Sequence, residues 1–231
     1  MKPYIVFLIA ILITSCTTNY ETAKKHYDMA QPCCQDFSEF NYETLPTDKP
    51  FAFDIDQSSP AFIFTSGKSY FKALKLPNLP VPYLLSIRSY AQGEMIDKAH
   101  IFFPKILFLK EDFAVTDEVN PAYLAEKSDD GDFTYEIDPA YVIEKSNDGA
   151  IKENKWGLPV RLSGRITIEN AESKYLLVIT TDELRSVAIQ WIQFMTGFAE
   201  IGAHLGLVPE GFFVIPGSPF GRLALELEPI K

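Results

Sequence analysis

The sequence has little of what most catalytic sites require. Its only histidines, among 231 residues, are His26, His100 and His204. It has no HExxH pair, no Gly-x-Ser-x-Gly turn, no phosphate-binding loop and no dinucleotide fingerprint. In PGSPFG, Pro219 follows Ser218 and removes the main-chain N–H that an oxyanion hole would use. We therefore expect no enzymatic activity and no cofactor. An unusual glycan hydrolase stays an alternative, because an acidic chain always offers pairs of carboxylates.

Positive charge is also scarce. The chain carries 21 Lys and Arg against 31 Asp and Glu, a net charge of −10. An acidic surface disfavours nucleic acid as a partner, and it disfavours electrostatic adhesion to anionic lipid. The length is sufficient to bury a core without disulfides or metals. We expect no nucleic-acid partner and no metal site.

The apolar run at the N-terminus is too short to cross a membrane. Lys2 precedes the run Tyr4–Ile13, which as a helix would extend roughly 15 Å, about half the hydrocarbon thickness. A basic residue followed by such a run is the layout of a secretory signal. A buried core helix or a badly trimmed domain start is the alternative. We interpret residues 1–15 as a signal peptide.

The residues after this run resemble the bacterial lipobox. In Ile-Thr-Ser-Cys, small residues precede Cys16, as they do where a cysteine becomes the lipidated first residue of the mature chain. Two or more acyl chains, palmitate among them, anchor a protein stably. Thr17 stands where an aspartate would resemble an inner-membrane retention signal, so we expect a lipoprotein at the outer membrane facing the periplasm. Residues 16–32 would then be the lipidated N-terminus and an extended tether, with a short helix possible before Pro32.

The two remaining cysteines, Cys33 and Cys34, are adjacent. Adjacent α-carbons lie about 3.8 Å apart, below the usual range for a disulfide. Free thiols, a strained vicinal disulfide and disulfides to another chain all remain open. A metal site needs more ligands than these two thiols.

Residues 33–231 alternate short aromatic and β-branched runs with turns rich in Pro, Ser and Gly. This pattern predicts a mostly β fold, a jelly-roll-like β-sandwich with one or two helices packed on it. The aromatic residues Phe62, Phe64, Tyr70 and Phe71 are expected in its core rather than on a sugar platform. The predicted strands lie in FAFDI (51–55), AFIF (61–64), SYFKALKL (69–76), YLLSIRSY (83–90), AHIFFPKILFLKEDF (99–113), LPVRLSGRITIEN (158–170), KYLLVITT (174–181) and RLALELEP (222–229).

An internal repeat interrupts this pattern. NPAYLAEKSDDGDF (120–133) recurs as DPAYVIEKSNDGAI (138–151), and two copies are fewer than a solenoid requires. We interpret about 117–155 as an acidic surface insertion. Calcium binding by Asp129, Asp130 and Asp132 is the alternative, although their spacing is not that of an EF-hand loop.

One amphipathic helix is predicted near the C-terminal third. Thr180 and Glu183 have capping-box spacing, and an apolar face follows at helical spacing. We expect this helix to pack on the sandwich, and the alternative is that it is offered to a partner protein. The predicted face consists of Leu184, Val187, Ala188, Trp191, Ile192 and Met195.

Six segments together resemble the maltose operon periplasmic protein family. The resemblance covers most of 33–116 and 174–228, and the acidic repeat departs from it as a local insertion. It implies a periplasmic protein associated with maltose or maltodextrin uptake, and it carries no site residues to this chain. The six segments are PCCQDFSEFNYETL (32–45), SGKSYFKALKLP (66–77), PYLLSIRSY (82–90), HIFFPKILFLKEDF (100–113), KYLLVITTDE (174–183) and GSPFGRLALELEP (217–229).

The expected function is therefore a non-enzymatic accessory role in carbohydrate transport, through binding of sugar or of a transport component. An envelope scaffold without a small-molecule ligand is the first alternative. A sugar binder should expose a flat aromatic ring, for which Trp156 and Tyr123 are the candidates. A scaffold should expose the apolar face around Trp191.

Overall fold

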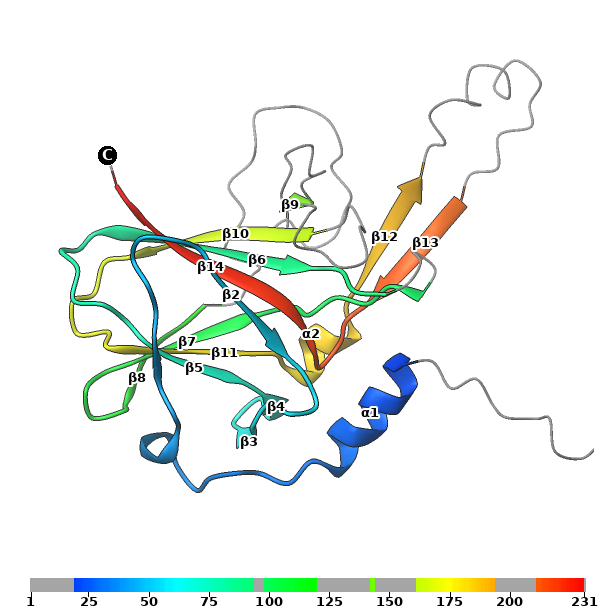
Figure 1. The fold of residues 1–231 in the computed structure, drawn as a ribbon, viewed down its shortest axis with the longest axis horizontal. Coiled ribbons are helices and arrows are strands. Elements are labelled where there is room, and N and C mark those ends of the chain that lie inside the picture. Colours follow the sequence, from blue (N-terminus) through cyan, green and yellow to red (C-terminus); the bar gives the residue numbers. More distant parts are fainter. Residues whose placement is uncertain (1–18, 94–97, 120–141, 144–160, 194–210, 231) are drawn as a thin grey trace, which may run out of the picture.

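The computed structural model describes residues 19–93, 98–119, 142–143, 161–193 and 211–230. Nearly half of these residues form strands, and three short helical segments accompany them (Figure 1). The helices are α1 (Asn19–Met29), the 3-10 helix η2 (Phe37–Glu39) and α2 (Asp182–Ser186). The strands are β1 (Glu43–Thr44), β2 (Phe51–Ile55), β3 (Ala61–Phe64), β4 (Gly67–Tyr70), β5 (Lys72–Lys75), β6 (Tyr83–Tyr90), β7 (Lys105–Leu109), β8 (Val115–Val119), β9 (Val142–Ile143), β10 (Arg161–Ile168), β11 (Tyr175–Ile179), β12 (Ala188–Gln193), β13 (Gly211–Pro216) and β14 (Gly221–Pro229).

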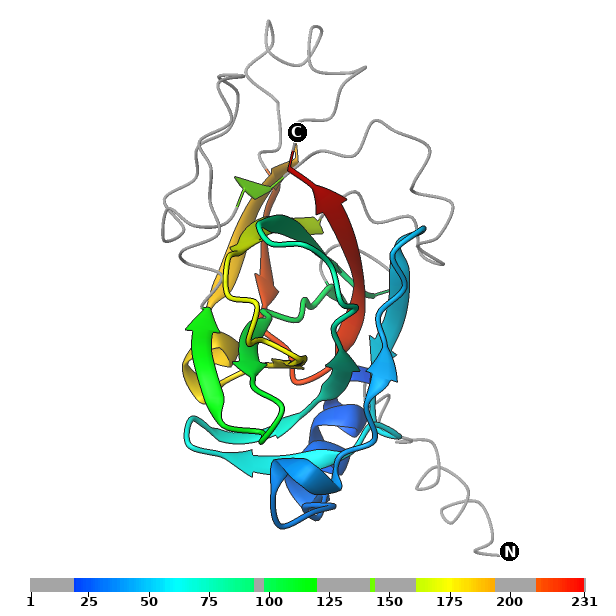
Figure 2. The ribbon, with the colours of Figure 1, turned by 90° about the vertical axis from the view of Figure 1, so that its left-hand side faces the viewer.

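Two five-stranded sheets form the sandwich. One has the order β1-β5-β11-β7-β8 and the other β2-β14-β6-β10-β9. Viewed after a 90° turn, the two sheets surround the core (Figure 2). Alternating residues of both sheets meet there, among them Leu74 and Leu176 from the first and Leu85 and Leu223 from the second. The predicted β-sandwich with one or two packed helices is confirmed.

The strand β11 is buried along its whole length because both faces of its sheet are covered. Leu176 and Val178 point into the core between the sheets, whereas Leu177 and Ile179 belong to a second apolar cluster. Side chains alternate between the faces of a strand, so this second cluster lies on the outer face. A strand buried on both faces has no polar positions, as the segment YLLVI shows.

The second cluster is rich in aromatic residues. Phe40, next to η2, stacks on Phe71 with 4.1 Å between ring centres, and Phe64 of β3 meets Phe71 edge-on at 5.9 Å. The side chains of Phe64, Tyr70 and Phe71 are buried and that of Phe62 is partly buried. The assignment of these aromatics to the core is confirmed.

The long helix predicted after Thr180 is wrong. The helix α2 ends at Ser186, and Ala188–Gln193 instead forms β12, antiparallel to β13. The residues Val187, Ile189 and Ile192 are β-branched and favour a strand once a partner strand is available. The cap also differs by one residue, because the hydroxyl of Thr181 accepts the N–H of Leu184 at 3.1 Å. Met195 lies outside the described residues.

The segment predicted as an extended tether is helical instead. α1 occupies Asn19–Met29, and Tyr27 within it is only 5% exposed. A short helix before Pro32 is therefore confirmed, and the extended spacer is wrong for residues 19–29. The helix lies against the sandwich because its tyrosines fill apolar surface there.

Cys33 and Cys34 form a vicinal disulfide, one of the three alternatives left open. Cys34 packs against the aromatic cluster on the outer face, and the Cys33 N–H donates to the carbonyl of Ala61 at 2.8 Å. The disulfide therefore sits where the chain leaves α1 and joins the sandwich.

Part of the predicted acidic insertion belongs to the sandwich. β8 pairs with β7 as far as Val119, and β9 pairs with β10. Asp129, Asp130 and Asp132 lie outside the described residues, as do both copies of the repeat except Val142 and Ile143.

Candidate functional site

The candidate site is the place where α1 docks on the sandwich, and α1 begins three positions after the predicted lipidation residue Cys16 in the sequence. We define the α1 docking site as Tyr20, Tyr27, Lys68, His100 and Arg185. In α1 and just after it, Tyr20, Ala23, Tyr27 and Ala30 recur at helical spacing and are all partly or fully buried. The other positions of the helix from Glu21 onward are exposed. The helix therefore docks through one narrow stripe.

Tyr27 is held between two cations. The Nζ atom of Lys68 lies 4.9 Å from the centre of its ring, and the guanidinium carbon of Arg185 lies 4.8 Å from it. The ring also meets Tyr70 edge-on at 5.3 Å. Cation–π contacts contribute about 0.5–2 kcal/mol each, more when they are shielded from water. Tyr27 is therefore the main point of attachment of α1.

The Tyr27 phenol is a hydrogen-bond donor in this site. Its hydroxyl donates to the carbonyl of Lys68. Burial raises the pKa of Tyr27 to about 12, and the nearby Arg185 charge opposes this rise only in part. The phenol therefore keeps its proton, and with it the hydrogen bond, across the physiological pH range.

Lys68 also caps the C-terminal end of α1. Its ammonium group donates to the carbonyl of Asp28 at 2.9 Å and to that of Ala30 at 3.4 Å. The last carbonyls of a helix have no partner within the helix, and a cation there also meets the negative end of the helix dipole. One side chain of β4 therefore both contacts the Tyr27 ring and satisfies the end of the helix.

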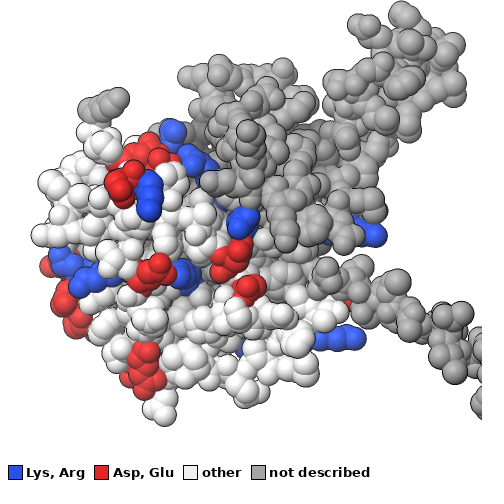
Figure 3. Space-filling model, in the orientation of Figure 1, with Lys and Arg blue, Asp and Glu red and all other residues white. Residues whose placement is uncertain are grey.

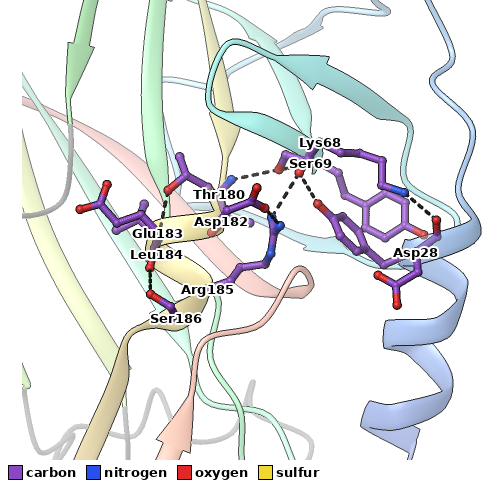
Figure 4. Close-up of polar contacts among 12 residues, drawn as sticks. Asp28, Lys68, Ser69, Thr180, Asp182, Glu183, Leu184, Arg185 and Ser186 are labelled. Atoms are coloured by element: carbon purple, nitrogen blue, oxygen red, sulfur yellow. Dashed lines mark hydrogen bonds and ion pairs between the residues drawn. The ribbon is translucent and has the colours of Figure 1, made fainter.

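Arg185 connects α2 to the same place. Its Nη1 donates to the carbonyl of Lys68 at 3.2 Å, and its Nη2 forms an ion pair with Asp182 (Figure 4). Asp182 in turn lies over Gly67, which has a φ of +106°. A Cβ atom on Gly67 would lie 2.8 Å from the Oδ2 of Asp182, so only glycine fits there.

A buried hydrogen bond fixes β4 relative to the start of α2. The Ser69 hydroxyl accepts the N–H of Thr180 at 3.0 Å and donates to the carbonyl of Tyr70 (Figure 4). Both Ser69 and Thr180 are almost completely buried. The Thr180 hydroxyl has no hydrogen-bond partner among the described residues. Ser69 therefore links β4, which carries Lys68, to the residues that lead into α2, which carries Arg185.

The first turn of α1 docks at a second point. The ring of Tyr20 lies 5.1 Å from that of His100 and 5.7 Å from that of Phe220, and its hydroxyl donates to the carbonyl of Gly217 at 3.3 Å. His100 is 8% exposed, and its Nδ1 has no hydrogen-bond partner among the described residues. Burial lowers the pKa of His100 to about 4. The imidazole is therefore neutral and packs as an aromatic ring.

The α1 docking site fixes the position of the helix on the sandwich. It consists of a helix held by two aromatic residues, two cations and main-chain carbonyls. Within the described ranges, no group of three His, Cys, Asp or Glu residues is arranged to hold a metal ion. None of the described helices is long and apolar enough to cross a membrane.

Charges of both signs are mixed on the face that Figure 3 shows. Among the described residues, Arg222 pairs with Asp54 and Arg88 with Glu226 across neighbouring strands, each at 3.2 Å. Exposed pairs of this kind contribute little stability.

The site residues predicted from sequence are not brought together. Cys16, Tyr123 and Trp156 lie outside the described residues. Trp191 is in β12, where its α-carbon is paired with that of Phe213, and not in a helix. Sequence reasoning missed Tyr20 and Tyr27, although their spacing of seven residues around Ala23 was a signal for one buried helix face. Nothing in the sequence indicated Lys68 or Arg185 as their partners.

Comparison of the chain with known proteins gives no match among family models, curated proteins or solved structures.

Proposed function

We propose that this chain is a periplasm-facing lipoprotein of the outer membrane that acts, without catalysis, as an accessory in carbohydrate uptake. Cys16 is the lipid attachment point, and the sandwich binds sugar or a transport component. The basic residue, short apolar run and lipobox-like residues at the N-terminus support the anchor. The resemblance to the maltose operon periplasmic protein family supports the link to carbohydrate.

The observation that carries this proposal is the fixed position of α1 so close to Cys16. Two residues, Thr17 and Thr18, separate Cys16 from Asn19, and the three steps from one α-carbon to the next span about 10 Å at full extension. The helix that follows is docked at Tyr20 and again at Tyr27. A lipid on Cys16 therefore holds the sandwich close to the bilayer, whereas an extended tether would let it move away.

The disulfide between Cys33 and Cys34 agrees with this location. Disulfides persist in oxidising compartments such as the periplasm and are rare where thiol reductants are abundant.

Fractionation of cells that produce the full-length chain tests the anchor. We expect the wild-type protein in the outer-membrane fraction and the Cys16→Ser variant in no membrane fraction.

Titration of the full chain in detergent with malto-oligosaccharides and other glycans tests whether the sandwich binds sugar. A ligand that binds only the folded state at a hundredfold excess over its Kd stabilises it by about 2.7 kcal/mol, seen as a rise in Tm. A rise in Tm with one class of glycan supports the sugar-binding role. An unchanged Tm with every glycan in the panel favours the envelope scaffold.

A further inference from the structure

The end of α1 that is nearest to Cys16 contacts the base of a two-stranded ribbon. The ribbon consists of β12 and β13, and the hydroxyl of Tyr20 donates to Gly217, the residue after β13, at 3.3 Å. Tyr20 is four residues from Cys16. The first turn of α1 and the base of the ribbon are therefore in contact.

The base of the ribbon is firmly held. Ile215 is fully buried in an apolar cluster that includes Ile101 and Phe103, and Leu184 packs against it. The Ile101 N–H donates to the carbonyl of Pro216 at 3.0 Å. A Cβ atom on Gly217 would lie 2.7 Å from the carbonyl oxygen of Leu184, so the chain passes α2 at the closest approach a glycine allows. The direction of the ribbon is thus set by the sandwich.

Beyond its base the ribbon projects away from the two sheets (Figure 1). Its strands pair with one another, and in the described part of the chain they join no other sheet. Val214, one residue from the buried Ile215, is 57% exposed. Two-stranded ribbons are marginally stable in water unless a further surface covers them. The projecting part therefore needs a surface to rest on.

We infer that the β12–β13 ribbon and the first turn of α1 form the membrane-facing side of the protein, with Val214 resting against the lipid bilayer. This inference depends on the proposed lipidation of Cys16. With only Thr17 and Thr18 between Cys16 and Asn19, lipidation would keep the bilayer within about 10 Å of the first turn of α1. That turn is in contact with the base of the ribbon, so a bilayer is the surface nearest to the exposed apolar side chain. Because the chain has a net charge of −10, anionic lipid does not attract it, and burial of apolar side chains would supply the free energy of this contact.

Quenching by brominated lipid tests the orientation. The full-length chain is produced in cells, purified with its lipid, and placed in phosphatidylethanolamine and phosphatidylglycerol vesicles with brominated acyl chains. Both native tryptophans are replaced by Phe, and one tryptophan is introduced by Val214→Trp or by Val115→Trp. Val115 is 43% exposed and begins β8, which lies at the opposite end of the sandwich in Figure 1. Both sites are exposed, so both substitutions leave the core unchanged.

We expect the brominated lipid to quench the emission of the V214W variant at least twofold more than that of the V115W variant. Equal quenching, or stronger quenching of V115W, overturns the inference. The melting temperature of each variant, compared with that of the wild type, guards against misfolding of the multiple variants.

The two levels of the proposal fail differently. If the chain carries no lipid and does not float with the vesicles, the proposed anchor is wrong, and the orientation falls with it. If the chain is acylated and floats but V214W is not quenched more than V115W, the anchor stands and only the orientation is overturned.

Discussion

The guanidinium carbon of Arg185 lies 4.8 Å from the centre of the Tyr27 ring, and both groups bond to the same carbonyl, that of Lys68. Tyr27 belongs to α1, Lys68 to β4 and Arg185 to α2. Three segments that are distant in sequence thus meet at one main-chain oxygen. This arrangement fixes the helix α1 on the sandwich.

Removal of the Tyr27 hydroxyl separates the hydrogen bond from ring packing. We expect Tyr27→Phe to lower the free energy of unfolding by about 1 kcal/mol, because one hydrogen bond to a partly buried carbonyl is lost. Tyr27→Ala should cost about 3–5 kcal/mol, because it also empties the space between Lys68 and Arg185. Urea denaturation of the mature Cys16→Ser chain measures both values. Equal, small losses for the two variants would show that α1 is not docked through this ring.

The glycine at the β3–β4 turn is expected to tolerate no side chain. Gly67→Ala places a Cβ atom 2.8 Å from Asp182 and forces alanine to a φ of +106°, so we expect a loss of about 1–3 kcal/mol. Adding Asp182→Ala should recover part of this loss, because it removes the close contact but not the unfavourable φ. Gly164, in β10 where φ is not positive, is the control for alanine substitution. Thermal melts in which G67A matches the wild type would contradict this explanation.

Two adjacent threonines should respond in opposite ways. Thr181 caps α2 through its hydroxyl, so Thr181→Ala should cost about 1 kcal/mol. The Thr180 hydroxyl is buried without a partner among the described residues, so Thr180→Val should be neutral or stabilising. The urea denaturation midpoints of the two variants, each compared with that of the wild type, test both expectations. If T180V is destabilised and T181A is not, Thr180 caps the helix, as the sequence predicted, and Thr181 does not.

Stability should fall in mild acid because His100 is buried in its neutral form. Its pKa is lowered to about 4 in the folded chain from an ordinary value of 6.5, so the unfolded chain binds the proton more readily between these values. The stabilisation is complete above about pH 6.5 and is lost as the pH falls towards 4, roughly 3 kcal/mol in all.

His100→Gln should remove most of this pH dependence, measured by urea denaturation at a series of pH values. His26→Gln is the matched control, because His26 is exposed on α1, and this variant should keep the loss in acid. A wild-type stability that does not change between pH 6.5 and 4 would show that His100 is not buried as described.

The strands were predictable from local pattern, whereas the docking of α1 and the strand β12 were not. The segments FAFDI, AFIF and YLLSIRSY coincide with β2, β3 and β6, because short runs rich in aromatic and β-branched residues and bounded by turn residues favour strands. The apolar residues of 184–193 are compatible with one face of a helix and also with a strand. Residues 188–193 form a strand because they pair with β13. Arg185 donates to the carbonyl of Lys68, which is 117 residues away in the sequence, and no local sequence pattern predicts a contact over that separation.

Mass spectrometry of the N-terminal peptide of the mature protein, isolated from cells that produce the full-length chain, tests the central claim most directly. The account predicts a peptide that begins at Cys16 with a diacylglyceryl group on Sγ and an acyl chain on the amino group. A mature chain that begins at another residue, or one in which Cys16 keeps a free thiol, would contradict it.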